Sequence, residues 1–446
     1  DYIKYDAYDN NFLSNGIISL DRNFNHHAYE VKYYYQNIWA EAVDMETGKI
    51  SVFNENFFTD LSAYYAEWTL NVNGQPVQRG IVEKLNVAPQ KKETITLPYD
   101  LSKVDRTQEV LLNVEFRMKS AAHMLPAGHV IAHRQLEVNP YKFAALSSTV
   151  KADVNKAPLK VRSNDWNFLQ IDGDRFAIEF NKHNGLLSSF VVNGMEMLEG
   201  QLSPNFWRAP TDNDFGASLQ RRYSAWKNPR MRLESLKNEI ADNKVKVSAV
   251  YDIRQVSARL YLDYLIDAAG NITVTQKLDA SDTAKVSEMF RFGMQMQMPQ
   301  SFSVVEYYGR GPYENYSDRN NSANIGQYRQ TVQDQFYSYV RPQENGLKTD
   351  VRYWKQLNKG GRGLMFTSTA AFSASALNYS IESLDDGYDK DQRHSAEVPT
   401  VPYTNFCIDY VHMGLGCVTS WGALPLPQYR VPYKDYEFTF KISPVF

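Results

Sequence analysis

The sequence predicts a mostly β protein in which an immunoglobulin-like β-sandwich is followed by a large antiparallel β-supersandwich. From about residue 39 to 139, short segments of alternating apolar and polar residues recur every ~8–12 residues between turn signals, which is the pattern of a sandwich. Beyond residue 158 the β segments become longer and more numerous, as in a large antiparallel fold. Helical periodicity is confined to two short stretches. With 446 residues, the chain can form two or more domains that each have a core.

The composition excludes several classes of partner. Lys plus Arg (48) nearly balances Asp plus Glu (51), so neither nucleic acid nor an anionic membrane surface is an expected partner. No apolar run approaches the ~18 residues that a membrane helix needs, and the first ten residues lack the features of a signal peptide. We therefore expect a soluble protein, in the cytoplasm or the periplasm. The only two cysteines, Cys407 and Cys417, form either one disulfide or two free thiols.

The first 38 residues do not resemble the start of a domain. An Asn15-Gly16 turn precedes a short apolar segment, and residues 27–36 then fit one helix. Ala28, Val31 and Tyr35 have the spacing of a buried stripe on that helix.

Residues 39–139 are predicted to form the immunoglobulin-like sandwich. Asn73-Gly74 is a strong signal for a hairpin turn. The strands are expected at residues 38–43, 49–54, 63–72, 93–98, 109–118 and 129–138.

Residues 140–446 are predicted to form the supersandwich, after a passage rich in Pro, Ala and Lys at residues 139–158. Its clearest strand segments are residues 176–194, 244–266 and 271–280, and a short helix is expected near residues 217–227. Four acidic residues are interpreted as a solvated loop, since the Gly and distal Glu of a Ca²⁺ loop are missing: Asp385, Asp386, Asp389 and Asp391.

Residues 304–319 combine a strand with a dense polar loop. Alternation over residues 301–308 predicts a half-buried strand, which residues 309–312 would break into a turn. The loop that follows contains Tyr313, Glu314, Asn315, Tyr316, Asp318 and Arg319. A structural network that ties the loop to its sheet is the favoured interpretation, because buried polar groups must be paired. Direct ligand contact is the alternative.

A second polar constellation occupies residues 205–216. Asp212, Asn213 and Asp214 carry oxygen atoms of the kind that a hard cation prefers. An equally good account is that Asp212 and Asp214 pair with Arg208 and cap a helix beginning near Ala217.

Three motifs in this order carry a family resemblance: GRGPYENYSDR at residues 309–319, YVRPQENG at 339–346 and HMGLG…SWG at 412–422. Together they resemble the small-chain domain of the large β-galactosidases of glycoside hydrolase family 2. The resemblance implies that residues 140–446 are this domain, with a supersandwich of the galactose-mutarotase type, and that residues 39–139 are the immunoglobulin-like spacer. Residues 1–38 resemble the last loop and helix of the family's catalytic (β/α)₈ barrel.

The resemblance also implies roles for individual residues. The Phe12 carbonyl and the Asn15 side chain match positions that bind a monovalent cation, Na⁺ or K⁺, beside the galactose. Asn15 and Trp421 match substrate-binding positions, although by residue type alone Trp421 is more typical of a buried core tryptophan. Asp212, Asp214 and Gly216 fall in a mobile loop beside the active site, with Gly216 as its hinge because glycine tolerates positive φ.

The sequence departs from the family pattern at two places near these residues. Residues 23–27 replace the usual Pro-His-Pro type of run, and Cys417, Val418 and Thr419 replace a commonly acidic stretch. A divalent ion, Mg²⁺ or Ca²⁺, is a further expectation for the full enzyme.

The carboxylate pair of a retaining glycosidase is not recognisable in the sequence. Glu314 and Glu344 lie in loops with no spacing that suggests a catalytic pair. The resemblance therefore implies that the chain is the C-terminal segment of a β-galactosidase, inactive alone, with an upstream catalytic barrel as partner and a β-galactoside or lactose-like oligosaccharide as substrate. A homo-oligomer is also an expected assembly. The alternatives are a non-catalytic carbohydrate-binding module and, less favoured, a sugar epimerase.

Overall fold

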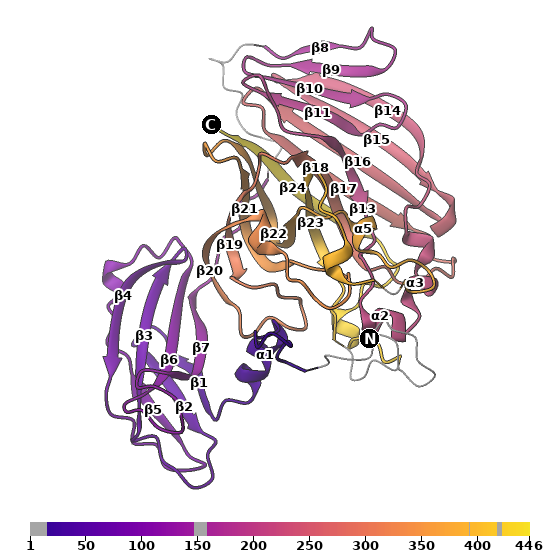
Figure 1. Ribbon diagram of the computed structural model, residues 1–446. Helices are drawn as coiled ribbons and strands as arrows, with labels where there is room; N and C mark the ends of the chain where they lie inside the picture. The colour runs from indigo at the N-terminus through magenta and orange to yellow at the C-terminus, as the bar shows by residue number, and fades with distance from the viewer. Residues whose placement is uncertain (1–15, 147–157, 392, 417–421) are drawn as a thin grey trace, which may run out of the picture. The chain divides into compact units, whose positions relative to one another are not determined.

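The computed structural model describes residues 16–146, 158–391, 393–416 and 422–446, and in it the chain divides into two units (Figure 1). The sandwich unit comprises Gly16–Lys142 together with Asn321–Gln327. The larger unit contains the described parts of Phe143–Asn320 and Tyr328–Phe446. Each unit has its own hydrophobic core.

The sandwich unit contains two antiparallel sheets, of three and four strands. Asn73 and Gly74 join β3 to β4 with positive φ at both positions (46° and 77°), which confirms the predicted hairpin turn. The smaller sheet has the order β1 (Ile38–Asp44), β2 (Lys49–Asn54), β5 (Lys92–Thr96). The larger has the order β4 (Gln75–Val82), β3 (Tyr64–Val72), β6 (Val110–Met118), β7 (Val130–Asn139), and a 3₁₀ turn, η1, spans Leu101–Lys103.

The core of the sandwich unit follows from the alternation in its strands. Trp68, Leu70 and Phe116 point inward from the four-stranded sheet, and Ile50 and Val52 from the other. Strand β4 was not among the predicted strands. Its residues are exposed or half-buried and include a proline and a glycine, so the sequence carries no apolar alternation there.

Helix α1 (His27–Tyr34) confirms the predicted helix and the burial of Ala28, but Tyr35 does not belong to a buried stripe. The helix ends before Tyr35, whose side chain is 81% exposed, and Tyr33 is buried instead. Glu30 is also buried, because its carboxylate accepts hydrogen bonds from the backbone N–H groups of Asn321 (3.0 Å) and Ser322 (2.9 Å). These partners lie almost 300 residues away in the sequence, so a local pattern could not reveal them.

The larger unit is one antiparallel network of strands, and the predicted mostly β fold with a large antiparallel supersandwich is confirmed. One run of paired strands has the order β14-β15-β16-β17-β24-β22-β21-β19, and another has the order β22-β23-β18-β13-β11-β10-β9-β8, with β12 on β11. The strands before residue 300 are β8 (Lys160–Arg162), β9 (Phe168–Asp172), β10 (Phe176–Asn181), β11 (Leu187–Val192), β12 (Met195–Glu196), β13 (Gly200–Asn205), β14 (Arg232–Ala241), β15 (Lys244–Ile253), β16 (Ala258–Asp267), β17 (Ile272–Ala280) and β18 (Arg291–Pro299). Those after it are β19 (Val304–Gly311), β20 (Asn324–Thr331), β21 (Lys348–Leu357), β22 (Gly363–Leu377), β23 (Tyr403–His412) and β24 (Tyr436–Val445).

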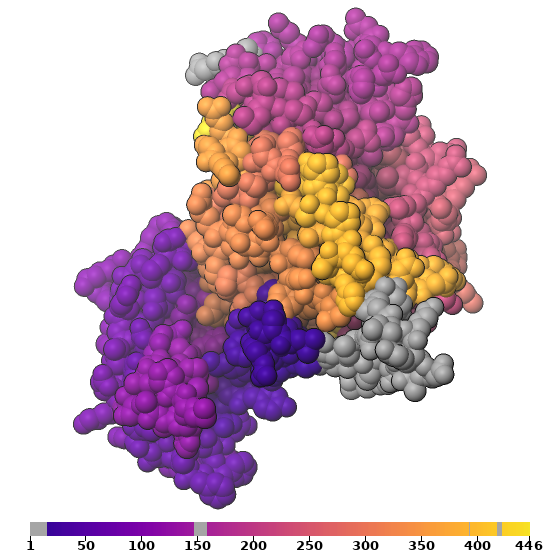
Figure 2. Space-filling view, in the orientation of Figure 1, coloured from indigo at the N-terminus to yellow at the C-terminus, as the bar shows by residue number. Residues whose placement is uncertain are grey.

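Strand β22 belongs to both runs, because it changes partner along its length. Its first part, up to Ser368, pairs with β24, and its last part, from Ser373, pairs with β23. The sheet therefore curls at β22 and encloses an aromatic core, in which Tyr307 and Trp354 stack with ring centroids 5.2 Å apart. Figure 2 shows that segments distant in sequence, coloured magenta, orange and yellow, together form one face of this unit.

Strand β19 extends to Gly311, so the expectation that residues 309–312 break the strand is wrong. A Cβ on Gly309 would lie 3.0 Å from Val351 Cα, and a Cβ on Gly311 would lie 2.1 Å from the Tyr307 hydroxyl. These glycines allow close approach inside a sheet rather than a turn.

The helices of the larger unit are short and lie in its connections. Three of the eight in the described residues lie within residues 212–226, which confirms a helical segment near residues 217–227 and extends it toward the N-terminus. The eight are α2 (Asp212–Gly216), α3 (Leu219–Arg222), η2 (Ser224–Trp226), η3 (Arg254–Val256), α4 (Val332–Gln335), α5 (Ile381–Leu384), η4 (Ser395–Glu397) and η5 (Pro427–Tyr429). In the part of the chain that the structure describes, no helix has the length and apolar character needed to cross a bilayer.

Candidate functional site

The polar motifs of the sequence converge on the main chain of residues 413–416, which we call the clamped segment. On one side, Arg208 donates to the carbonyl oxygens of Met413 (2.7 Å) and Gly414 (3.2 Å). On the other side, Asp318 accepts hydrogen bonds from the backbone N–H groups of Leu415 (3.1 Å) and Gly416 (2.5 Å). Side chains from two distant motifs thus fix both edges of one short stretch of backbone.

Glycine is required in the clamped segment because the Asp318 carboxylate lies so close. A Cβ on Gly414 would be 2.4 Å from Asp318 Oδ2, and a Cβ on Gly416 would be 2.7 Å from the same atom. The small residues of the HMGLG motif therefore serve a close approach.

Arg208 is itself fixed by a buried ion pair with Asp214. Its Nε and Nη2 atoms donate to the two carboxylate oxygens at 3.0 and 2.7 Å, and neither side chain is more than 4% exposed. Asp214 also caps helix α2, because its carboxylate accepts from Thr211 N while Thr211 Oγ1 accepts from Asp214 N. The pairing of Asp214 with Arg208 is confirmed.

The predicted pairing of Asp212 with Arg208 is wrong. Its carboxylate pairs with Arg341 (3.1 Å) and Lys390 (3.0 Å), and its side chain is 54% exposed. The capping box of Thr211 and Asp214 begins α2 at Asp212, whereas the helix start expected near Ala217 corresponds to α3, which begins at Leu219 without a side-chain cap. Gly216 is the last residue of α2 and has a helical conformation, so tolerance of positive φ does not explain a glycine there.

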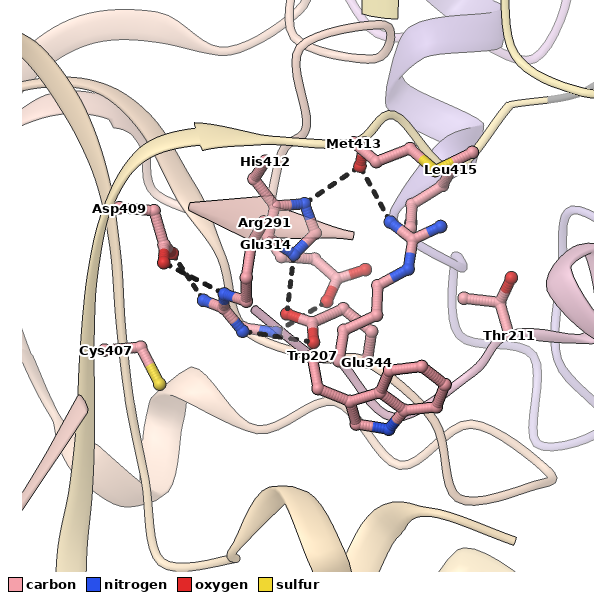
Figure 3. Close-up of polar contacts among 12 residues, drawn as sticks. Trp207, Thr211, Arg291, Glu314, Glu344, Cys407, Asp409, His412, Met413 and Leu415 are labelled. Atoms are coloured by element: carbon pink, nitrogen blue, oxygen red, sulfur yellow. Dashed lines mark hydrogen bonds and ion pairs between the residues drawn. The ribbon is translucent and has the colours of Figure 1, made fainter. Parts of the chain in front are cut away.

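Behind the clamped segment lies a buried charge cluster of Arg291, Glu344, Asp409 and His412 (Figure 3). Arg291 pairs with Asp409 through two hydrogen bonds, one of them 2.9 Å from Nε to Oδ1. Glu344 lies between Arg291 Nη1 (3.7 Å) and His412 Nε2 (3.6 Å). Backbone contacts anchor the cluster, because His412 Nδ1 lies 2.9 Å from the Met413 carbonyl oxygen and Glu344 N donates to Ala209 O (2.9 Å).

Burial and charge shift the ionisation of this cluster in opposite directions. Burial alone would raise the pKa of Glu344, but Arg291 and His412 together lower it below its usual value. Burial lowers the pKa of His412, which favours the neutral ring. The nearby Cys407 is a buried free thiol whose pKa burial raises to about 12, so it is not a reactive thiolate. Cys417 lies outside the described residues.

The loop after β19 confirms the structural interpretation of its polar residues. Glu314 accepts hydrogen bonds from Arg319 (2.8 Å), from the Tyr339 hydroxyl and from Gly346 N (2.8 Å). Asn315 Oδ1 accepts from the backbone N (3.0 Å) and the hydroxyl (2.6 Å) of Thr349. These bonds tie the loop to the YVRPQENG motif and to the start of β21.

The solvated-loop interpretation of the acidic residues is wrong for two of the four. Asp386 is fully buried between Arg341 and Arg393, and Asp385 binds Lys227 (2.6 Å) and the Trp207 indole (2.9 Å). Lys227 and Arg341 come from distant segments and Arg393 lies seven residues from Asp386, and these cationic partners make burial possible. Asp389, by contrast, is 83% exposed and pairs with Arg221.

The structure leaves some predicted sites untested. Phe12, Asn15 and Trp421 lie outside the described residues. Within residues 16–146, 158–391, 393–416 and 422–446, no group of three or more His, Cys, Asp or Glu is placed to hold a metal ion.

Sequence reasoning missed Arg291 and Asp409. The signal was present, because each is a charged residue within an otherwise apolar strand segment, FRFGM and FCIDYV.

The chain matches two family models. The model of the β-galactosidase small chain matches residues 172–442, and the model of β-galactosidase domain 4 matches residues 50–139. Among curated proteins, a β-galactosidase from Priestia megaterium is 34% identical, with 98% of this chain and 41% of the relative covered. A β-galactosidase from Halalkalibacterium halodurans is 31% identical, with 98% of this chain and 42% of the relative covered.

Among solved structures, galactose 1-epimerase from Lactobacillus acidophilus aligns with 66% of this chain and 99% of its own, at 10% identity and a TM-score of 0.35. The chain spans only 41–42% of the length of the two curated relatives named above. The small-chain model matches residues 172–442, which is more than half of the chain. The chain therefore belongs to the family of the β-galactosidase small chain.

Proposed function

We propose that this chain is the non-catalytic part of a β-galactosidase that hydrolyses terminal β-D-galactosides with retention. In this proposal a catalytic barrel supplies the chemistry, and the larger unit completes the sugar site. The observation that carries the proposal is the clamped segment, because Arg208 and Asp318, from two distant motifs, fix the backbone that leads toward Trp421 in the sequence. Such precision is expected of a support for a binding residue.

The charges of the site favour a supporting role over a catalytic one. A retaining glycosidase needs a carboxylic acid and a nucleophilic carboxylate ~5 Å apart at the sugar. The buried carboxylates of Asp214, Glu314, Glu344 and Asp409 each contact a cationic side chain of the larger unit. Carboxylates neutralised in this way hold the backbone in place, and we assign the acid/base and the nucleophile to the barrel.

We further propose that Asn15 and Trp421 contact the sugar. Trp421 would stack on the apolar face of the galactoside or of its aglycone. Phe12 and Asn15 would offer a carbonyl and an amide oxygen to a monovalent cation, which would bring positive charge to the sugar hydroxyls. An indole face and neutral oxygen atoms suit a neutral sugar and a weakly bound cation.

Hydrolysis of a chromogenic β-galactoside tests the proposal. The 446-residue chain is assayed alone, the catalytic barrel segment alone, and then the two are combined. We expect turnover only in the combination, with retained anomeric configuration in the first-formed product by NMR. Turnover by the 446-residue chain alone would contradict the proposal, because its own residues would then include the catalytic carboxylates. Full activity of the barrel segment alone would equally contradict it.

A further inference from the structure

A pocket of about 320 Å³ opens in the larger unit where strand β22 exchanges its partner β24 for β23. The two partner strands separate there, and residues 371–373 of β22 form one wall of the pocket. The start of β21, the end of β23, η5 with the two residues that follow it, and the loop after β19 form the remaining walls. The volume lies at the lower end of the range of ligand pockets, roughly 300–1,000 Å³, and therefore suits a single sugar ring.

The pocket is electrically balanced, which favours a neutral ligand. Arg430 lines it but already binds both carboxylate oxygens of Glu288, at 3.0 and 2.6 Å. Asp350 lines it too, and its carboxylate accepts from Arg310 Nε at 2.5 Å. Neither charge lacks a partner, so an anion or a cation would meet a group that is already neutralised.

The other groups suit a polyhydroxylated ligand. Ser317 and Gln428 bring a hydroxyl and an amide to the pocket and are exposed to solvent. Tyr410 lines it with a ring that stacks on Phe438 at 5.8 Å and remains 41% exposed. A fixed aromatic ring beside hydrogen-bonding groups is the combination that binds the apolar face and the hydroxyls of a sugar.

A β-bulge lies at the edge of the pocket. The register between β21 and β22 shifts between Lys348 and Val351, and Asp350 in this bulge has a φ of 51°, in the left-handed region that aspartate adopts more readily than most non-glycine residues. Arg352 donates to the Asp350 carbonyl oxygen (2.5 Å) and Arg310 holds its carboxylate, so the surroundings fix this conformation. Bulges are over-represented next to active sites, where they redirect side chains.

We propose that this pocket binds a neutral, polyhydroxylated ligand of monosaccharide size. Tyr410 would lie against the ring of the ligand, and Ser317 and Gln428 would bind its hydroxyls. This inference does not depend on the proposed function, because the pocket is built entirely from described residues of the larger unit.

Titration of the 446-residue chain with D-galactose, followed by isothermal calorimetry and saturation-transfer NMR, tests the proposal. We expect saturable binding that Tyr410→Ala weakens about fivefold, because an aromatic contact to the sugar ring is lost. Gln428→Ala should also weaken it, and this exposed residue can be replaced without disturbing the core. Tyr35→Ala, which removes another exposed tyrosine from the sandwich unit, is the matched control and should leave the affinity unchanged.

Inorganic phosphate serves as the probe for a charged ligand, and we expect it not to displace galactose. Three results would overturn the proposal. These are no saturable binding of galactose, competition by phosphate, and galactose binding that survives Tyr410→Ala and Gln428→Ala but is lost in Trp421→Ala. The last result would place the sugar at the tryptophan instead of in this pocket. None of these results depends on hydrolysis, so the proposed function is tested separately.

Discussion

The two units of this chain handle charge in different ways. Among the described residues of the sandwich unit, ion pairs are exposed or half-buried, as in Arg106–Glu46 with side chains 48% and 59% exposed. Its core contains apolar side chains. The larger unit instead buries pairs completely, and in Arg291–Asp409 neither side chain is more than 1% exposed.

The difference indicates that the buried ion pairs of the larger unit fix the position of side chains and backbone more than they stabilise the fold. Burying an ion pair costs desolvation energy that its Coulomb attraction barely repays, so an apolar replacement of both partners is often as stable. The sandwich unit has an apolar core, and its buried Glu30 carboxylate accepts hydrogen bonds from backbone N–H groups. In the larger unit, Arg208 of the buried Arg208–Asp214 pair donates to the backbone of Met413 and Gly414, so the cost of burying this pair is accompanied by a fixed backbone path.

The most severe test of this comparison is Arg208→Met. The change leaves the buried Asp214 carboxylate without its cation and removes two donors to the clamped segment. We expect the unfolding free energy of the larger unit to fall by about 3–5 kcal/mol. Urea unfolding followed by tryptophan fluorescence measures it.

Arg106→Met in the sandwich unit is the matched control for Arg208→Met. It breaks an exposed pair, which should cost at most about 1 kcal/mol. Equal losses of unfolding free energy in the two variants would show that breaking the buried pair costs no more than breaking the exposed one. The contrast between the units would then be wrong.

The buried Lys348 of the larger unit provides a second test, because it should make the stability of this unit depend on pH. Its ammonium group is buried and donates to Gln335 Oε1 (2.8 Å) and Gly346 O (3.0 Å), and burial lowers its pKa from 10.5 to about 8. Between these two values the unfolded chain binds more protons than the folded one, so stability must rise with pH across this window. We expect the stability of the wild type relative to Lys348→Met to increase by roughly 1–3 kcal/mol from pH 8 to pH 10.5.

Urea midpoints at several pH values for both proteins measure this difference. Comparison with Lys348→Met cancels the titration of all other groups that the substitution leaves unchanged. A pH-independent difference between the two proteins would mean that Lys348 keeps its ordinary pKa despite burial.

Asp318→Ala tests the clamp itself. The change removes the acceptor of the Leu415 and Gly416 N–H groups, and an unmade hydrogen bond of this kind costs about 1–2 kcal/mol. We expect faster hydrogen exchange at these two amides and a lower kcat in the complete enzyme. Asp279→Ala, which breaks a surface pair with Lys277, is the control. Unchanged exchange at Leu415 and Gly416 would show that the clamped segment holds its path without Asp318.

Gly216→Ala is expected to have the smallest effect on stability of the substitutions proposed. Because Gly216 is helical, alanine should strengthen α2 by at most about 1 kcal/mol and shift the predicted loop toward the helical state. In the complete enzyme we expect kcat and KM to change together, as steady-state kinetics would show. Kinetic constants identical to those of the wild type would count against a hinge at this position.

Most of the strands could be predicted because one face of each is buried, so side chains alternate visibly along β3, β6, β15 and β16. The same argument explains the failures. Strand β4 has no buried face to reveal it, and in β19 two glycines that serve close packing have the signature of a turn. The alternation of apolar and polar residues indicates which strands have a buried face. It gives no signal where a strand has no buried face or where a glycine is needed for packing.

The candidate site was predictable only in part. The polar loop at residues 313–319 and the pairing of Asp214 with Arg208 followed from the rule that buried polar groups need partners. That Asp386 would be buried did not, because its partner Arg341 lies 45 residues away in the sequence, and Arg393, seven residues away, is not enough to indicate burial. Which charges meet is decided by the sheet topology.

The position of β24 between β17 and β22 has a consequence for synthesis of the chain. Strand β17 begins at Ile272, but its partner β24 begins only at Tyr436. At roughly 5–20 residues per second, a ribosome needs on the order of 10–30 s to complete that interval. During this time the backbone donors and acceptors along one edge of β17 have no strand to bind, and they are open to pairing with another nascent chain. The larger unit therefore depends on late closure of its sheet, and chaperone demand should concentrate on this interval of translation.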